Sequence, residues 1–212
     1  MSPRLISRAD ILPMQDYAKV RDERRRRVAE VKKNRRVHVG PDVTLYFENF
    51  ETMLHQVHEM LAVEKGGEAQ IDDELRAYNP LIPGGRELVA TMMIEIDDAA
   101  RRDRVLRELG GIENAVALVI AGEPIAAVPE RDVERTTEDG KTSSVHFLRF
   151  PFTDAQVAAF RADGARVVLA LSHPGYDQMA ALPDRVRGAL ADDFTCSAEA
   201  AERTSSGANS LG

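Results

Sequence analysis

The chain has 212 residues, a net charge of −7 and 43% hydrophobic residues, which is enough apolar content for a substantial core. The negative charge argues against strong nucleic-acid binding by the molecule as a whole, and no apolar run reaches the roughly 20 residues that a membrane span needs. The single cysteine, Cys196, excludes an internal disulfide and any metal site built from several thiolates of this chain. The N-terminal residues lack the apolar stretch of a signal peptide. These features predict a cytoplasmic protein that does not associate with a membrane.

The N-terminal part, residues 7–80, is predicted to be mainly helical. A helix is expected from Met14 to Lys33, where a thin apolar stripe lies opposite a run of arginines and lysines. Residues 37–47 alternate between apolar and polar side chains around a Gly-Pro-Asp turn, which predicts a hairpin. Asn49 is a good N-cap for a helix that runs to about Glu64. A short helix, 70–78, is expected next.

The following part, residues 86–175, is predicted to alternate strands with helices. Strands are expected at Leu88–Ile96, Ala115–Ala121, Ile125–Val128, Thr142–Phe152 and Arg166–Leu171. Helices are expected over 98–109 and 153–163, and a capping box of Thr153 and Gln156 marks the start of the second. Residues 130–141 are polar and predict an exposed loop. A last helix is expected at 183–193, and residues 197–212 predict a disordered tail because they offer little to bury.

The order strand, helix, strand, strand, helix, strand from Leu88 onward is typical of the split β-α-β pattern. We therefore predict an α+β fold with a ferredoxin-like βαββαβ sheet. Its central strands would be Leu88–Ile96 and Ser143–Phe152, because both segments are apolar on both faces. The motif's own helices cover one face, so an N-terminal helical and hairpin layer is expected to cover the second face. The prediction is a single α+β domain over residues 1–195.

One candidate site is a metal centre on the helix at 49–64. Glu51, His55 and His58 are spaced i, i+4 and i+7, and Glu59 lies close to their stripe. Carboxylates and imidazoles at such spacing are the ligands of non-haem iron, manganese or zinc sites. An ordinary solvated helix flank is the alternative interpretation.

A second set of candidates lies on the two central strands. Glu95 and Arg149 would form an ion pair if these strands were parallel neighbours, either as a structural pair or as the lining of a pocket. His146 shares a face with Leu148 and Phe150, which is typical of a core histidine but leaves a catalytic role open. The sequence contains no phosphate-binding glycine loop and no nucleophile elbow, so no reaction can be named from it.

The basic stretch Arg21–Arg36 offers a third hypothesis. It is either a solvated charged face or an RNA- or anion-binding helix, and it lacks the interleaved aromatic residues that stack on bases.

Three stretches resemble an uncharacterised bacterial family classed as a domain of unknown function: FENFETMLHQVHEML, ELRAYNPLIPGGRELVATMMIE and GKTSSVHFLRFPF. With the leading RADILPMQDY, the resemblance extends over about residues 5–175. Genes of that family often lie beside genes for rubrerythrin-like and iron–sulfur oxidoreductase proteins. The resemblance therefore implies an accessory or binding protein of a redox- or oxidative-stress system, with such proteins as partners.

The positions that match the family pattern include pocket candidates on several elements. They are Gln56, Glu59, Met60, Tyr78, Asn79, Pro80, Glu95, His146 and Arg149. His55 and His58 lie outside that pattern, which shifts the interest from a metal towards Glu59, Glu95 and Arg149. Convergence of Glu59, Glu95, Arg149 and His146 on one cavity would indicate a site, and scatter would indicate structural roles. Enzymatic activity and homo-oligomerisation are left open.

Overall fold

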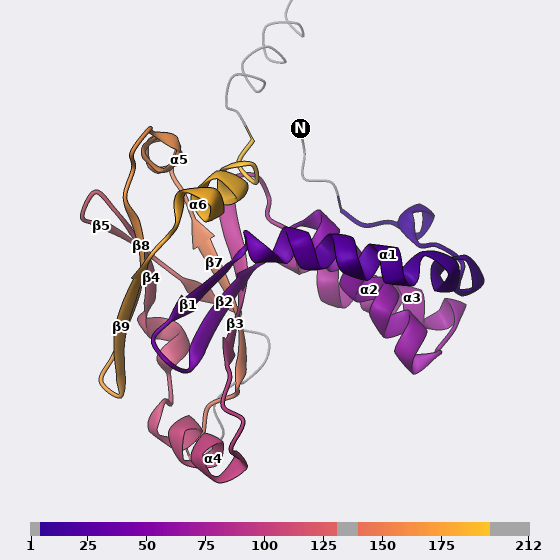
Figure 1. Cartoon of the computed structure of the whole chain (residues 1–212), viewed down its shortest axis with the longest axis horizontal. Helices are drawn as coiled ribbons and strands as arrows, with labels where there is room; N and C mark the ends of the chain where they lie inside the picture. The colour runs from indigo at the N-terminus through magenta and orange to yellow at the C-terminus, as the bar shows by residue number, and fades with distance from the viewer. Residues whose placement is uncertain (1–4, 131–139, 196–212) are drawn as a thin grey trace, which may run out of the picture.

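The structure is a computed structural model that describes residues 5–130 and 140–195, and it combines helices with two antiparallel sheets (Figure 1). This confirms the α+β class. The predicted tail at 197–212 and most of the loop predicted at 130–141 lie outside the described residues. The helices are α1 (Met14–Lys33), α2 (Phe50–Glu64), α3 (Glu68–Tyr78), α4 (Ala99–Glu108), α5 (Asp154–Arg161) and α6 (Asp184–Ala191). Short 3-10 turns occur at Arg8–Asp10, Asn79–Leu81 and Ile112–Ala115.

The first sheet has the strand order β1-β2-β3-β7-β6. Its strands are β1 (Arg36–Val39), β2 (Val43–Phe47), β3 (Glu87–Ile94), β6 (Val128–Pro129) and β7 (Val145–Pro151). The predicted hairpin is confirmed as β1 and β2, and it extends the sheet by pairing with β3. The two segments predicted to be central, β3 and β7, are direct neighbours, but they run antiparallel.

The second sheet has the order β5-β4-β8-β9, which corrects the prediction of a single ferredoxin-like sheet. Its strands are β4 (Val116–Ile120), β5 (Glu123–Ala126), β8 (Val167–His173) and β9 (Tyr176–Ala181). The sequence pattern did not predict β9, because most of its side chains are exposed and do not alternate. β4 pairs with β8, and β8 pairs with β9, so β4 and β8 belong to a separate sheet and do not lie beside β3 and β7.

The inner faces of the two sheets form the main core. Leu88 and Leu148 of the first sheet and Leu118 and Leu169 of the second are fully buried in one apolar cluster. Burying one apolar face of each sheet against the other is the usual way in which antiparallel sheets remove hydrophobic surface from water.

The outer face of the first sheet is covered in part by the N-terminal helices, as predicted, whereas the hairpin that was expected in the same layer forms part of the sheet itself. Val57 and Leu61 of α2 form a second apolar cluster with Val89 of β3, and Phe147 of β7 packs against it. Helices α1, α2 and α3 project from one side of the sheets as an arm (Figure 1). Glu95, just beyond β3, is exposed, so the arm leaves that end of the face uncovered. Within the described ranges, no helix is both long enough and apolar enough to cross a bilayer.

Candidate functional site

Glu59 is held inside the arm, at the contact between α1 and α2. Its carboxylate accepts hydrogen bonds from Nε and Nη2 of Arg21 and from the hydroxyl of Tyr17, each at 2.8 Å. The hydrogen bonds from Arg21, with that from Tyr17, lower the pKa of Glu59 to about 2. Burial and the hydrogen bond to Glu59 raise the pKa of Tyr17 well above its usual value. Glu59 is therefore an ionised residue that fastens two helices together.

The predicted metal ligands have other partners. The buried His58 accepts a hydrogen bond at Nε2 from the backbone N–H of Leu12 at 3.0 Å, and its Nδ1 donates to the carbonyl of Leu54 at 2.8 Å. The His58 ring also stacks on Tyr17, with centroids 4.6 Å apart. Glu51 forms an ion pair with Arg27 at 2.6 Å. Both imidazole nitrogens of His58 are therefore already in use.

Residues 5–130 and 140–195 contain no group of three or more His, Cys, Asp or Glu side chains that could hold a metal ion. The iron, manganese or zinc site predicted from Glu51, His55, His58 and Glu59 is thus not assembled in this part of the chain. Helical spacing brought these side chains to one side of α2, but α1 packs against that side and supplies partners for Glu51, His55 and Glu59. Burial lowers the pKa of both His55 and His58.

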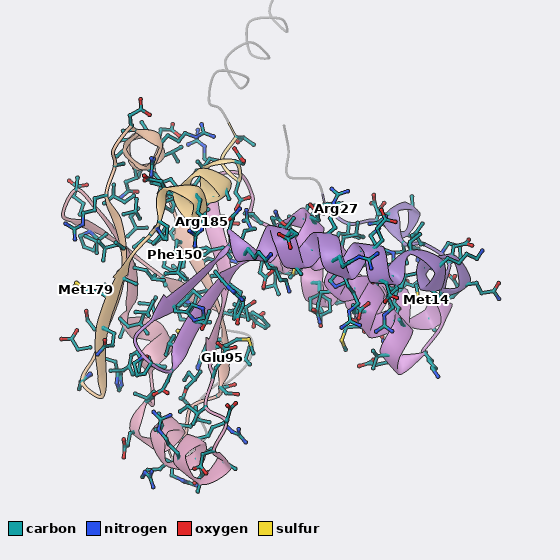
Figure 2. The ribbon with its side chains drawn as sticks, in the orientation of Figure 1. Met14, Arg27, Glu95, Phe150, Met179 and Arg185 are labelled. Atoms are coloured by element: carbon teal, nitrogen blue, oxygen red, sulfur yellow. The ribbon has the colours of Figure 1, made fainter. Side chains whose placement is uncertain are left out.

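The candidates on the central strands do not converge. Because β3 and β7 are antiparallel, Arg149 lies opposite Val89, so the predicted Glu95–Arg149 pair is wrong. Arg149 instead pairs with Glu87 at 2.7 Å and donates to the carbonyl of Pro80. Glu95 accepts a hydrogen bond from the Tyr46 hydroxyl at 3.0 Å. Glu95 lies low on the sheets in Figure 2, apart from the arm that carries Arg27 and Met14.

His146 and Asn79 are placed in supporting positions. His146 is buried and its Nε2 lies 2.9 Å from the carbonyl oxygen of Ser143. The Asn79 side chain accepts from the N–H of Ile6 at 2.8 Å and donates to its carbonyl at 2.9 Å, which ties the N-terminal segment to the end of α3. Glu59, Glu95, Arg149 and His146 are therefore scattered, and each has structural contacts.

Tyr78 and Gln56, two positions of the family pattern, line the same cavity. This cavity, of 310 Å³, lies between the arm and the outer face of the first sheet, and we call it the arm cavity. Its lining consists of Lys32, Tyr46, Glu48, Met53, Gln56, Tyr78, Leu81, Thr91, Met93, Val145 and Phe147. The strand residues of the lining are cross-strand neighbours in the first sheet. Tyr46 lies opposite Thr91, Thr91 opposite Phe147 and Met93 opposite Val145.

The polar groups of the arm cavity differ in the hydrogen bonds and ion pairs that they already form. Glu48 is buried, and its two carboxylate oxygens accept from the hydroxyls of Thr91 at 2.8 Å and Thr52 at 2.7 Å. Burial raises the pKa of Tyr46 and of Tyr78, which favours the neutral phenol in both, and the Tyr46 hydroxyl already donates to Glu95. Lys32 has no carboxylate within ion-pair distance among the described residues.

Most of this lining was not predicted from the sequence. Gln56 and Tyr78 were noted through the family pattern, but Lys32, Tyr46 and Thr91 were not. Their only signal is that they stand on the polar side of their elements, as many solvent-exposed residues do.

The fold and the cavity define an α+β protein with two packed sheets and a ligand-sized space beneath a helical arm. Residues 5–194 match the family described as "Protein of unknown function (DUF3501)", and the chain belongs to this family. A crystal structure described as a novel protein of unknown function, from Burkholderia pseudomallei, is similar, with a TM-score of 0.84 and 39% identity. The match covers 91% of this chain and 100% of that one. No curated protein matches.

The family resemblance is therefore confirmed, and the redox-stress setting that it implied stays a prediction. The family and the similar crystal structure are both described as of unknown function. The arm cavity is therefore the feature of this chain on which a function can be proposed.

Proposed function

We propose that this protein is a binding protein whose ligand occupies the arm cavity. The observation that carries the proposal is the 310 Å³ space left where the arm stands off the outer face of β3 and β7. Ligand sites are typically concave, mostly apolar and about 300–1,000 Å³ in volume, with a few placed polar groups. Met93, Val145 and Phe147 supply the apolar part here, and Gln56 and Tyr78 supply polar groups from the arm.

The chemistry of the lining supports binding rather than catalysis. A general base needs a free lone pair within reach of the substrate and a pKa near the working pH. Each carboxylate oxygen of Glu48 instead already accepts from a hydroxyl donor, and burial favours the protonated form of the Tyr46 and Tyr78 phenols. The described lining thus offers hydrogen-bond donors and apolar contacts.

Identification of the molecules that co-purify with the protein tests this proposal. The native chain is purified from its own cells, denatured, and the released small molecules are identified by mass spectrometry. Val145→Phe is expected to remove the ligand, because the larger ring fills the floor of the cavity. Ala126→Phe, on the exposed side of β5, is a matched control that should keep it. A ligand profile that Val145→Phe leaves unchanged would contradict the proposal.

The family resemblance supports a cytoplasmic redox-stress setting for this binding role. Rubrerythrin-like or iron–sulfur proteins would then be the partners. Affinity purification of the full chain from unstressed and peroxide-treated cells tests this, and repeated failure to recover any redox protein from either culture would count against it.

The alternative of an RNA- or anion-binding helix has less support. Arg21 and Arg27 of the basic stretch are engaged by Glu59 and Glu51 of α2, and Lys33 pairs with Glu30. Several cations of α1 therefore act within the arm, where they contribute to packing.

A further inference from the structure

We infer that the ligand of the arm cavity is a small organic anion with an apolar body, whose charged group lies against Lys32. This inference rests on the proposed function, and it adds the chemical class of the ligand.

The first argument is the unmatched positive charge at the cavity. Lys32 lines the cavity from the last turn of α1 and is half-buried, yet no carboxylate lies within ion-pair distance of it in the described residues. An ammonium group in a partly buried position gains most from a partner, because water screens the interaction less there. A bound anion would supply that partner.

Two further exposed cations act on neighbouring residues. Arg25 stands two helical turns before Lys32, and Arg36 lies opposite the lining residue Tyr46 in the register of β1 and β2. Lys32 and Arg25 each contribute to the lowered pKa of His55, although burial is the largest cause. The charge of Arg36 likewise favours a lower pKa for Tyr46, but burial has the larger effect and the pKa of Tyr46 is raised. Of the three cations, Lys32 lines the cavity and Arg36 lies opposite the lining residue Tyr46.

Two acids also lie near the cavity, and their positions decide the sign of the preferred ligand. Both oxygens of Glu48 are bonded to the hydroxyls of Thr52 and Thr91. Glu95 is exposed and is bonded to the Tyr46 hydroxyl. Both acids already accept hydrogen bonds, whereas no carboxylate lies within ion-pair distance of Lys32 in the described residues, so an anion gains more at Lys32 than a cation gains at either acid. The geometry therefore favours an anion over a cation.

The second argument concerns the body of the ligand. Five of the lining residues are apolar: Met53, Leu81, Met93, Val145 and Phe147. At about 30 Å³ for each water-sized group, the cavity has room for about ten non-hydrogen atoms. Octanoate, with eight carbons and two oxygens, has about this size, and its chain would cover the apolar floor while its carboxylate reaches Lys32.

Three probes with the same eight-carbon chain separate charge from apolar contact: octanoate, 1-octanol and octylammonium. Their dissociation constants for the full chain are measured by calorimetry at about 0.15 M salt, where weak surface attraction is largely screened. We expect octanoate to bind about tenfold more tightly than 1-octanol, since a hydrogen bond to a charged group contributes more than a neutral one. Octylammonium should bind most weakly.

Two neighbouring lysines provide the matched variants. Lys32→Gln should weaken octanoate binding about tenfold and 1-octanol binding by much less, because the Gln amide can still donate to a hydroxyl oxygen. Lys33→Gln removes the same charge one residue away, where the side chain pairs with Glu30, and should leave both constants unchanged. Urea unfolding of both variants checks that the arm is intact.

The possible results are distinguishable. Equal affinity for octanoate and 1-octanol, or a Lys32→Gln variant that binds octanoate like the native chain, overturns the inference and leaves the binding role standing. Equal losses in Lys32→Gln and Lys33→Gln overturn it as well, because they indicate general surface charge. A preference for octylammonium overturns it in favour of Glu48 as the charge partner. Failure of all three probes also overturns it, while the molecules released from the native chain decide the proposed function separately.

Discussion

Arg21 of α1 donates hydrogen bonds to both carboxylate oxygens of Glu59 on α2, each at 2.8 Å. The Glu59 side chain is only 20% exposed, so this bidentate pair is better shielded than an ordinary surface salt bridge. It fixes α1 on α2, and these two helices carry Lys32 and Gln56 to the arm cavity.

Glu59→Gln is expected to lower the free energy of unfolding by about 1 kcal/mol, because it removes one charge of a partly shielded bidentate pair. Urea unfolding at pH 7 measures the change. Glu30→Gln is the control, since its pair with Lys33 is exposed, and it should alter stability by less than about 0.5 kcal/mol. Equal effects of the two substitutions would contradict the structural role of Glu59.

The same carboxyl group predicts a dependence on pH. Its folded-state pKa, about 2, lies below the ordinary value of 4.5, so the unfolded chain binds the proton more readily. The stabilisation is therefore fully present above pH 4.5 and is lost as the pH falls towards 2. The stability difference between the native chain and Glu59→Gln should be constant from pH 7 to 5 and shrink at pH 4 and 3. A difference that persists unchanged at pH 3 would be inconsistent with this account.

Arg35 is a buried cation at the junction of α1 and β1, and its loss should be far more damaging. Its guanidinium donates to the carbonyls of Phe47, Glu48 and Ala189 at 2.9–3.0 Å, and it pairs with Asp193. Burial raises the pKa of Asp193 to about 6 even though the charge of Arg35 opposes this. Removing one member of such a buried pair typically costs about 3–5 kcal/mol.

Arg35→Gln is accordingly expected to lower the free energy of unfolding by about 3 kcal/mol or more. The adjacent Arg36→Gln, at an exposed position, should change it by less than about 0.5 kcal/mol. Chemical denaturation of the two variants side by side makes the comparison. Similar midpoints would show that the buried network is not needed for stability.

Tyr176 connects the two sheets through its hydroxyl. The oxygen accepts from the N–H groups of Asp42 at 3.0 Å and Val43 at 3.2 Å, and the hydroxyl donates to the carbonyl of Val39 at 2.7 Å. Tyr176→Phe removes all three of these hydrogen bonds to backbone groups, so we expect a loss of about 2 kcal/mol. Tyr46→Phe, which removes a single bond to the exposed Glu95, should cost less than half as much in the same unfolding experiment.

Local features of the fold were predictable because they depend on neighbouring residues. The capping box at the start of α5 is formed, with Gln156 N–H bonded to Thr153 Oγ1 at 3.3 Å and Thr153 N–H bonded to Gln156 Oε1 at 2.9 Å. Asn49 likewise caps α2 by accepting from the N–H of Thr52 at 2.9 Å. Each of these signals lies within four residues of chain and needs no information about the rest of the molecule.

The arm cavity was predictable only in part. Tyr78 stood out through the family pattern, whereas Lys32, Tyr46 and Thr91 line the cavity because of where the arm ends on the sheet. That position depends on which apolar residues of α2 meet Val89 and Phe147, and so on contacts between residues far apart in sequence.

The sequence by itself determined the helices, the strands except β6 and β9, and the α+β class, since 3.6-residue and two-residue periodicities state how each segment is buried. Only the tertiary structure decided that β3 and β7 are antiparallel and that β4 and β8 belong to a second sheet. The physical reason is that two apolar faces predict that a strand is covered on both sides. They do not indicate which strand lies beside it. Which strands become neighbours depends on packing across the whole core. The edge strand β9 contributes to this pairing, but its mostly exposed side chains give no strand pattern in the sequence.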